Sequence, residues 1–220
     1  MLKKEELVAL YQKRAKNYDL VANLYYLIGF REVAYRKIAS AALNLKPGDT
    51  VVEIACGTGL NFSFLQNAIG PTGKIIGIDI TDKMLEQARR RIEQNGWNNV
   101  ELIKTDAAEY VFPEGINGII SVFAITLIPE YAQIIKNGSR ALANGGRFAV
   151  LDFKEPANRP LWSTKLLVSL TKCFGVSLDL AVRHPWETIA TCLTPVMFED
   201  LYFGFTYISV GEANKSKSVS

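Results

Sequence analysis

The sequence predicts an α/β domain with a mainly parallel β-sheet and helices on both of its faces. Short apolar segments rich in β-branched residues alternate along the chain with segments of helical periodicity, and glycine and proline turns separate them. The chain has 220 residues, of which 49% are hydrophobic and 21% charged, as in globular domains with a sizeable core. We therefore expect one domain over residues 1–213 and a loose polar tail over residues 214–220.

The N-terminal part, residues 1–45, is predicted to be helical. From residue 4 onward, apolar and aromatic side chains recur at helical spacing, at Leu7, Leu10, Tyr11 and Tyr18. Residues 19–44 are expected to form one or two further helices, with Gly29 as a break, before the turn Lys46-Pro47-Gly48-Asp49. The first helix could fold over a ligand as a lid through its two tyrosines, or it could simply pack on the core.

The central part, residues 46–153, is predicted to contain five buried strands. These strands are residues 50–55, 74–79, 100–104, 118–124 and 147–153. Three helices are expected between them, over residues 61–69, 83–95 and 131–142. Thr81 or Asp82 can cap the start of the second helix, and Asn144-Gly145-Gly146 is expected to cap the end of the third. Because crossover connections are right-handed, the carboxyl ends of the strands share one edge, where such sheets bind ligands.

The last part of the chain follows the fifth strand. Residues 154–195 form a longer connecting segment near the ligand-binding edge. Residues 196–213 are rich in Phe and Tyr, with a turn near Gly204, and are predicted to form a hairpin that closes the sheet.

Charge and hydropathy exclude several classes of protein. The formal net charge of +3 is too small and too dispersed to favour nucleic-acid binding, and the densest basic run, Arg89-Arg90-Arg91, is interpreted as a solvated helix face. No stretch reaches the roughly 18 apolar residues of a membrane span, and Lys3-Lys4 precedes no apolar run of signal-peptide length. We therefore expect a cytoplasmic protein without a nucleic-acid partner.

Cysteine and histidine usage argues against a metal site. Cys56, Cys173 and Cys192 have no CxxC spacing, so a disulfide framework or a zinc site is not expected. They are interpreted as small buried hydrophobic residues in a reducing compartment. His184 is the one histidine, which excludes a multi-histidine site.

A glycine loop, Glu53-Ile54-Ala55-Cys56-Gly57-Thr58-Gly59, lies between the first strand and the following helix. Because glycine has no Cβ, a ligand can approach the backbone closely, and the start of the helix offers free N–H groups. These features alone suit NAD, a phosphate or S-adenosylmethionine.

Acidic residues at successive strand ends favour S-adenosylmethionine among these ligands. Glu53 would repel a pyrophosphate, but it suits a ligand with a sulfonium and an amino group. Asp79 lies 20 residues after Gly59, the spacing of a carboxylate that binds a ribose diol. Asp106 can meet the adenine amino group. The third glycine of the dinucleotide fingerprint is replaced by Phe62, which disfavours NAD.

Each of these residues also has a purely structural interpretation. Asp79 could cap a helix. Asp106, followed by Ala107-Ala108-Glu109, could equally be a helix N-cap. Met84 lies one helical turn into the next helix, where it could cover the adenine face or belong to the core.

Four segments resemble motifs of the class I S-adenosylmethionine-dependent methyltransferases. Residues 53–59 resemble motif I, and residues 78–88 resemble the acidic motif of the second strand. Residues 105–109 resemble the adenine-contacting segment, and residues 142–147 resemble the turn into the fifth strand. The match covers roughly residues 47–153. Ala55 stands where the superfamily usually has glycine, so it would be strained if that position needs a positive φ.

The resemblance implies a Rossmann-like, seven-stranded sheet with an antiparallel final hairpin and an N-terminal helical lid. It also implies S-adenosyl-L-methionine as the methyl donor and S-adenosyl-L-homocysteine as the product. The residues expected to contact the donor are Tyr11, Tyr18, Glu53, Ala55, Gly57, Thr58, Gly59, Asp79, Ile80, Met84, Asp106, Ala107, Phe123 and Ala124.

Within the superfamily, the chain is most similar to the ubiquinone/menaquinone methyltransferase-like group and to bacterial phosphatidylethanolamine N-methyltransferases. The similarity lies in Tyr11 and in Ala15-Lys16-Asn17-Tyr18-Asp19 ahead of motif I. It also lies in Leu201-Tyr202-Phe203-Gly204-Phe205 near the end of the chain.

The acceptor side of the reaction is less defined by the sequence. Methyl transfer is an in-line displacement, so the enzyme mainly aligns the two reactants in a site shielded from water. A nitrogen acceptor only has to lose its proton, whereas a carbon or hydroxyl acceptor needs a base. His184 is the one candidate base with an ordinary pKa near neutrality, and a structural role is its alternative. The candidate acceptor contacts are Tyr18, Asp152, Arg183 and Trp186, where Arg183 could pair with an acidic acceptor or sit exposed.

The apolar segment 161–176, with Lys165 and Lys172 interspersed, could line an acceptor pocket, rest on a membrane surface or form a core helix. We therefore expect a small apolar or amphipathic acceptor, such as an amine, a lipid head group or a natural-product intermediate. N-methylation is favoured over C- or O-methylation of a quinol-like acceptor. An NAD-dependent oxidoreductase and a non-catalytic S-adenosylmethionine-binding module are the alternatives from other classes, and the oligomeric state is left open.

Overall fold

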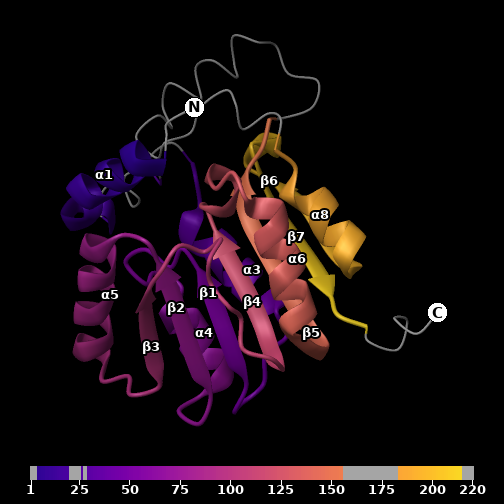
Figure 1. Cartoon of the computed structure of the whole chain (residues 1–220), viewed down its shortest axis with the longest axis horizontal. Coiled ribbons are helices and arrows are strands. Elements are labelled where there is room, and N and C mark those ends of the chain that lie inside the picture. The colour runs from indigo at the N-terminus through magenta and orange to yellow at the C-terminus, as the bar shows by residue number, and fades with distance from the viewer. Residues whose placement is uncertain (1–3, 20–25, 27–28, 156–182, 215–220) are drawn as a thin grey trace.

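Seven strands form one β-sheet at the centre of the molecule (Figure 1). The computed structural model describes residues 4–19, 26, 29–155 and 183–214. The strands are β1 (Thr50–Ile54), β2 (Lys74–Asp79), β3 (Val100–Lys104), β4 (Ile116–Val122), β5 (Leu142–Phe153), β6 (Thr194–Leu201) and β7 (Thr206–Glu212). Their order is β3-β2-β1-β4-β5-β7-β6; the first five run parallel, and β7 is antiparallel to β5 and β6. The expected mostly parallel sheet with an antiparallel final hairpin is confirmed.

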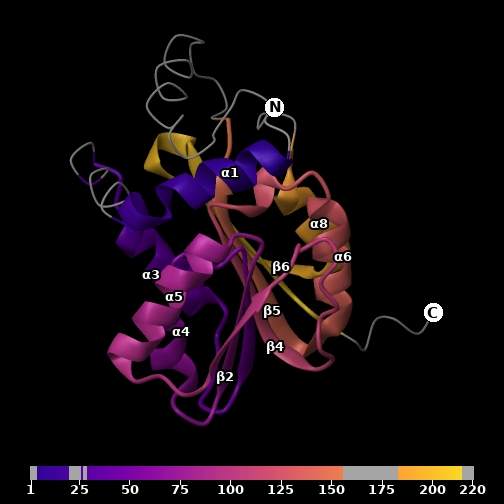
Figure 2. The same cartoon turned by 60° about the vertical axis from the view of Figure 1, so that its left-hand side comes forward.

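Helices cover both faces of this sheet (Figure 2). They are α1 (Lys4–Arg14), η1 (Ala15–Asn17), α3 (Glu32–Ala42), α4 (Phe62–Ile69), α5 (Asp82–Asn95), η3 (Ile125–Leu127), α6 (Tyr131–Ala141), α8 (Pro185–Cys192) and η6 (Tyr202–Gly204). Side chains of α3, α4 and α5 pack in the core on one face, and side chains of α6 and α8 pack in the core on the other.

The central strand β1 shows why the predicted strands are continuous apolar runs. Val51 packs on the side of α3, α4 and α5, whereas Val52 and Ile54 pack on the side of α6 and α8. All three side chains are fully buried. A strand that is covered on both faces has no solvent-facing position, so hydrophobic and polar residues do not alternate along it.

The N-terminal helix α1 lies across the carboxyl end of the sheet rather than on a face of it (Figure 1). It packs beside α5, and η1 also contacts α5. The described side chains of α1, residues 5–14, are exposed or only half-buried. The position of α1 over the strand ends therefore depends on few contacts.

The glycine pair after α6 has a different role from the one expected. Asn144, Gly145 and Gly146 lie within β5 and do not cap the helix, which ends at Ala141. The Gly145 N–H donates to the carbonyl of Ala213 at 2.7 Å, and the Ala213 N–H donates to the carbonyl of Gly146 at 2.8 Å. This pairing with the chain after β7 extends the sheet through the glycines. A Cβ on Gly146 would lie 2.9–3.1 Å from three backbone carbonyl oxygens, which explains the glycine.

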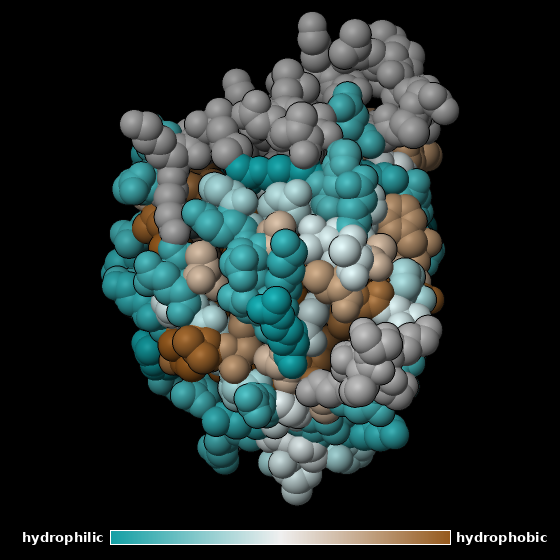
Figure 3. Space-filling model, turned by 45° about the vertical axis from the view of Figure 1, so that its right-hand side comes forward, coloured by the Kyte–Doolittle hydropathy of each residue, from teal (hydrophilic) through white to brown (hydrophobic). Residues whose placement is uncertain are grey.

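The surface seen from the side of α6 and α8 is mainly hydrophilic, with apolar patches that hydrophilic side chains separate (Figure 3). Scattered patches of this kind are normal on a protein surface. No helix in the described parts of the chain is long and apolar enough to cross a membrane. The apolar segment 161–176 lies outside the described residues.

Candidate functional site

The glycine loop adopts left-handed backbone conformations at three positions. The φ angles are 52° at Ala55, 56° at Gly57 and 76° at Gly59. A Cβ on Gly57 would meet open space, whereas a Cβ on Gly59 would lie 2.6 Å from the ring of Phe62. Phe62, which stands where a dinucleotide fingerprint has its third glycine, thus packs directly under the loop.

Two residues that carry a Cβ also adopt this left-handed conformation, at the carboxyl edge of the sheet. Ala55 follows β1, and Phe123, with a φ of 54°, follows the neighbouring strand β4. The left-handed region costs a residue with a Cβ roughly 1–2 kcal/mol. The strain anticipated for Ala55 is therefore present, and it lies where strained backbone often accompanies a ligand site.

Two adjoining cavities open at this edge, with empty volumes of about 620 Å³ and about 550 Å³, partly open to solvent. Both are lined by Leu7, Val8, Ala55, Asp79, Ile80, Leu127 and Ile128. The first is also lined by Tyr11, Tyr18, Gly57, Thr81, Met84, Val122, Phe123 and Ala124. The second is also lined by Ile78, Thr105, Asp106, Ala107 and Pro129.

Most residues predicted from the sequence to contact the donor line these cavities. They are Tyr11, Tyr18, Ala55, Gly57, Asp79, Ile80, Met84, Asp106, Ala107, Phe123 and Ala124. Glu53, Thr58 and Gly59 lie in or beside the loop without being part of the cavity walls described. Leu127, Ile128 and Pro129, which follow β4, are cavity residues that the sequence does not reveal, because apolar residues there carry no signal that separates a cavity wall from core.

Asp79, at the end of β2, is fixed by two backbone groups. Its Oδ2 accepts a hydrogen bond from the Gly57 N–H at 2.9 Å, and its Oδ1 accepts one from the Thr81 N–H at 2.8 Å. Burial raises the pKa of Asp79, while these two hydrogen bonds act to lower it. Thr81 is the N-cap residue of α5, but its own side chain makes no capping bond, so the carboxylate of Asp79 takes over part of that role.

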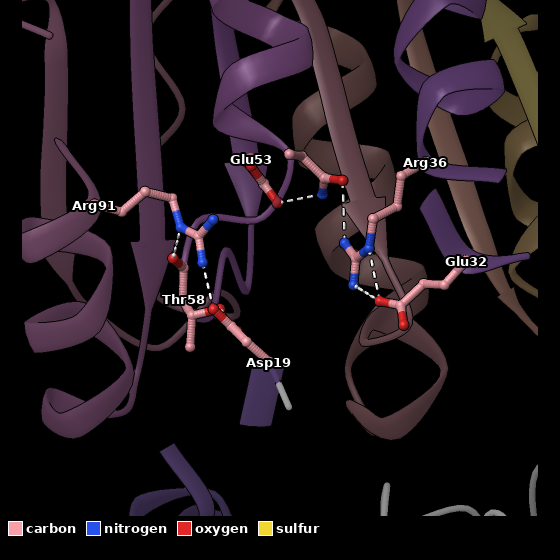
Figure 4. A network of polar contacts seen from close by, with 7 residues as sticks. Asp19, Glu32, Arg36, Glu53, Thr58 and Arg91 are labelled. Atoms are coloured by element: carbon pink, nitrogen blue, oxygen red, sulfur yellow. Dashed lines mark hydrogen bonds and ion pairs between the residues drawn. The ribbon is translucent and has the colours of Figure 1, made fainter. Parts of the chain in front are cut away.

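Glu53, at the end of β1, belongs to a buried polar chain (Figure 4). Its Oε1 accepts a hydrogen bond from Asn61 Nδ2 at 2.6 Å, and Asn61 Oδ1 accepts one from Arg36 Nη1 at 3.0 Å. Arg36 also pairs with Glu32 Oε1, at 2.7 Å from Nε and 2.5 Å from Nη2. The other carboxylate oxygen of Glu53 is buried and has no partner among the described residues. Burial raises the pKa of Glu53 to about 7.

Asp106 begins a turn rather than a helix. Its Oδ1 accepts a hydrogen bond from the Ala108 N–H at 3.0 Å, and residues 107–109 form a turn. The helix N-cap interpretation of Asp106 is therefore wrong, because no helix follows it. The residue lines the second cavity.

The aromatic residues of the N-terminal helix reach the first cavity. The rings of Tyr11 and Tyr18 lie with centroids 6.2 Å apart, and both side chains line the cavity together with Leu7 and Val8. Burial raises the pKa of both tyrosines, so their hydroxyl groups stay protonated near neutral pH.

The third arginine of the basic run is not on a solvated face. Arg91 Nε donates to the carbonyl of Thr58 at 2.9 Å, and Arg91 Nη2 pairs with Asp19 Oδ2 (Figure 4). The hydroxyl of Thr58 donates to Asp19 Oδ1 at 2.6 Å. Arg90, by contrast, is exposed and pairs with Glu86 on the surface of α5 at 2.7 Å. The solvated-face interpretation is therefore wrong for Arg91, whose orientation depends on two distant segments.

Apart from Tyr18, which lines the first cavity, the candidate acceptor residues lie on the side of β5, β7 and α8. The ring of His184 stacks on Trp186 with centroids 4.6 Å apart, and its Nδ1 lies 3.0 Å from Glu187 Oε1. Trp186 in turn packs edge-on against Tyr207, with centroids 4.8 Å apart. None of His184, Trp186, Arg183 and Asp152 lines either cavity as the described residues define it.

Arg183 and Asp152 meet at the segment after β4. Arg183 is buried, not exposed, and its Nη1 donates to the carbonyl of Thr126 at 2.7 Å. Asp152 Oδ2 accepts a hydrogen bond from the Thr126 N–H at 2.9 Å. Burial raises the pKa of Asp152 to about 6. Both side chains thus hold η3 in place, directly before the cavity residues Leu127 and Ile128.

Fold and site together define a class I S-adenosylmethionine-dependent methyltransferase. Three acidic residues at the carboxyl ends of β1, β2 and β3 surround a glycine loop, a charge distribution that suits a cationic donor and opposes a pyrophosphate. The family is also identified by sequence. The family model of the ubiE/COQ5 methyltransferase family matches residues 1–171, and the chain belongs to that family.

Relatives and solved structures agree with this assignment. A demethylmenaquinone methyltransferase of Listeria monocytogenes is 29% identical over 162 residues, which cover 73% of this chain and 67% of the relative. A putative methyltransferase of Haloferax volcanii, solved in complex with the Trm112 methyltransferase activator, has a TM-score of 0.71 at 17% identity and covers 93% of this chain and 97% of its own. Geranyl diphosphate C-methyltransferase from Streptomyces coelicolor A3(2) has a TM-score of 0.67 at 15% identity, covering 82% and 79%. The two structures show the shared fold.

Proposed function

We propose that this protein transfers the methyl group of S-adenosylmethionine to a small apolar acceptor of the quinol class, and that the cavities at the carboxyl edge hold the donor. The observation that carries the donor assignment is the lining of the two adjoining cavities, which includes the glycine loop, Asp79 and Asp106. The relatives named demethylmenaquinone methyltransferases support the acceptor class. A cytoplasmic location, with the acceptor as a small-molecule partner, belongs to the same proposal.

The residues present fit this donor on two structural grounds. The buried oxygen of Glu53 that has no partner in the described parts of the chain can accept a hydrogen bond from a cationic group, and the open space at Gly57 lets a ligand approach the backbone. When bound, the donor supplies a methyl group on a positively charged sulfur. Asp79 would hold the ribose hydroxyls, because each of its oxygens keeps a free lone pair beside its backbone hydrogen bond.

The adenine end and the methyl end of the donor would lie in different cavities, which share Ala55, Asp79 and Ile80 in their walls. Asp106 and Ala107 would hold the adenine in the second cavity, beside Ile80. Tyr11 and Tyr18 would cover the first cavity from above and exclude water. Met84 is almost fully buried and also lines that cavity, so it serves the core and the cavity wall together.

The acceptor would enter where the wall is apolar. Leu7, Val8, Phe123, Leu127 and Ile128 line this part of the first cavity and favour a hydrophobic ring over a charged acceptor. The segment 161–176, predicted to contribute to the acceptor side, lies outside the described residues.

An amine acceptor is the second candidate, and one observation favours it. The titratable side chains that line the described cavities are Asp79, Asp106, Tyr11 and Tyr18. Burial raises the pKa of Tyr11 and Tyr18, and Asp79 and Asp106 already accept backbone hydrogen bonds, so none of them is a ready base for carbon methylation. An amine, by contrast, has only to lose its proton. His184 stays the candidate base, and its replacement by glutamine tests it: a large fall in turnover at unchanged donor affinity would support that role.

A panel of acceptors tests the proposal. Purified protein is incubated with S-adenosylmethionine and, separately, a short-chain demethylmenaquinol, vesicles containing phosphatidylethanolamine and a set of free amines. Formation of S-adenosylhomocysteine and a one-methyl mass gain are measured. Turnover of the quinol supports the proposal, and turnover of amines alone replaces it with the second candidate. Donor binding by calorimetry without turnover of any acceptor would favour a non-catalytic binding module, and tighter binding of NAD would contradict the donor assignment.

A further inference from the structure

Three segments that are distant in the sequence meet at one carboxylate. Asp19 follows η1, Thr58 lies in the glycine loop, and Arg91 lies on α5 (Figure 4). Asp19 uses both of its oxygens: Oδ1 accepts from the Thr58 hydroxyl at 2.6 Å, and Oδ2 pairs with Arg91 Nη2. The same guanidinium donates from Nε to the Thr58 carbonyl at 2.9 Å. The three side chains therefore close a ring of contacts between the N-terminal segment, the loop and a helix.

These contacts fix the orientation of one peptide of the loop. The peptide between Thr58 and Gly59 is held at its carbonyl by Arg91 and at its N–H by the carbonyl of Cys56, at 3.0 Å. Its neighbour Gly57 is held through its N–H by Asp79. Together with the hydrogen bonds at Gly57 and Gly59, the Arg91 contact therefore fixes the orientation of the loop backbone toward the cavity.

The same contacts determine where the N-terminal segment lies. The described side chains of α1 are not fully buried, so α1 gains little from core packing. Asp19 directly follows Tyr18, which lines the first cavity, and the Asp19 contacts anchor that end of the segment to α5 and the loop. Among the described elements beyond η1, α1 has its main contacts with α5, so the Asp19 contacts add a second attachment of the segment.

We propose that Asp19 and Arg91 are positioning residues that latch the N-terminal segment and the glycine loop over the donor cavity and slow the release of the donor. This inference rests on the donor cavity proposed above. Asp19 and Arg91 do not touch the reacting atoms; they act through Tyr18 and Thr58. Their effect therefore falls on donor binding and donor KM rather than on acceptor KM.

The test compares Arg91→Gln and Asp19→Asn with Arg90→Gln. Arg90 is the matched control, because it is the neighbouring arginine of α5 and its side chain pairs with Glu86 on the surface. The dissociation rate of S-adenosylmethionine is measured by displacement with S-adenosylhomocysteine, together with donor Kd and the melting temperature of the ligand-free protein. A loss of one partly exposed, charge-assisted contact corresponds to a faster release by roughly two- to fivefold. We expect this change for Arg91→Gln and Asp19→Asn, and a wild-type rate for Arg90→Gln.

Two further measurements separate a latch from a general structural role. Hydrogen exchange of the amides of α1 in the ligand-free protein should be faster in Arg91→Gln than in Arg90→Gln, while exchange in β1 and β4 stays unchanged. The double variant Asp19→Asn/Arg91→Gln should release the donor no faster than the more affected single variant, because both changes open one latch. Wild-type release from Arg91→Gln, or an equal fall in melting temperature and donor affinity for Arg90→Gln, would overturn the latch. Absence of donor binding by the wild-type protein would instead contradict the proposed function.

Discussion

Asp79 Oδ2, at the carboxyl end of β2, accepts a hydrogen bond from the backbone N–H of Gly57 in the loop after β1, at 2.9 Å. The acid of one strand and the glycine loop of its neighbour are thus joined through the protein itself. Asp79 also holds the Thr81 N–H at the start of α5. One carboxylate therefore orders three elements of the proposed donor site.

Replacement of Asp79 by alanine is expected to weaken donor binding by roughly 1–3 kcal/mol, because the proposed ribose contact and the loop geometry are lost together. Asp79→Asn should retain part of the affinity, since the amide oxygen can still accept one backbone hydrogen bond. Calorimetry with S-adenosylmethionine measures the change. Asp82→Asn is the control, because Asp82 is the next acid on this segment and pairs with Lys104 at the surface. Unchanged affinity of Asp79→Ala would remove it from the donor site.

Two substitutions in the glycine loop are expected to have different effects on the stability of the protein. Ala55→Gly removes the strain of a left-handed alanine, which is roughly 1–2 kcal/mol, but makes the unfolded chain more flexible by about 0.4–1 kcal/mol. We expect a neutral to slightly stabilising change in the free energy of unfolding, measured with urea. Gly59→Ala should destabilise clearly, because its Cβ would lie 2.6 Å from the Phe62 ring. Equal effects of the two changes would contradict the assigned loop conformation.

The fold was largely predictable from the sequence, for physical reasons that particular elements show. Strands β1, β2 and β4 are buried along almost their whole length, so they appear as short apolar runs rich in β-branched residues. Their acids, Asp79 above all, could be placed at one edge because right-handed crossovers align the strand ends. The glycines after α6 were misassigned because a glycine pair fits a helix end and a tight sheet contact equally well, and only the pairing with Ala213 distinguishes them.

The site could be predicted from the sequence only at positions whose residue type has a recognisable chemical or conformational role. Acids and glycines signal a donor site, but Arg91 and Asp19 interact across 72 positions of sequence, which no local pattern reveals. Leu127 and Ile128 are cavity walls that resemble core residues in sequence. His184 was selected because it is the one histidine, and its stacking on Trp186 could not be seen in the sequence.

Arg36 is expected to stabilise the folded protein, in addition to its place in the buried polar chain that contains Glu53. Its side chain is 7% exposed and that of Glu32 is 11% exposed, so the ion pair between them is largely desolvated. Removing one partner of a buried pair leaves an uncompensated charge, and Arg36→Met should lower the free energy of unfolding by roughly 3 kcal/mol. Lys74→Met is the control: its pair with Glu101 is about half exposed, so a change below about 1 kcal/mol is expected. Similar losses in the two variants would show that burial does not make the Arg36–Glu32 pair more important for the free energy of unfolding than an exposed pair.

The stability of the ligand-free protein should depend on pH through Glu53. Burial raises the pKa of Glu53 from 4.5 to about 7 in the folded protein, so the folded state binds this proton more tightly than the unfolded chain. The stability that protonated Glu53 contributes is full below pH 4.5 and is lost as pH rises through about 7. The stability that protonated Asp152 contributes is likewise lost as pH rises, between pH 3.8 and about 6.

Glu53→Gln removes the Glu53 part of this pH dependence, which is on the order of 3 kcal/mol. Urea unfolding at a series of pH values measures it in the wild-type protein and in the variant. Glu101→Gln, which removes an exposed carboxylate, should leave the slope unchanged. A variant Glu53→Gln with the wild-type slope would show that Glu53 does not titrate in this range.

Donor binding should release a proton from the same carboxyl group. A cationic donor next to Glu53 favours its charged form and lowers its pKa from about 7, so near neutral pH part of the Glu53 population loses its proton on binding. Calorimetry at pH 7 in two buffers of different protonation enthalpy detects this release as a buffer-dependent heat. We expect the dependence in the wild-type protein and its loss in Glu53→Gln, with donor affinity rising with pH only when Glu53 is present. Heats that are independent of the buffer in the wild-type protein would mean that the unpartnered oxygen of Glu53 does not meet the charged part of the donor, and the polar chain from Arg36 would then serve the fold alone.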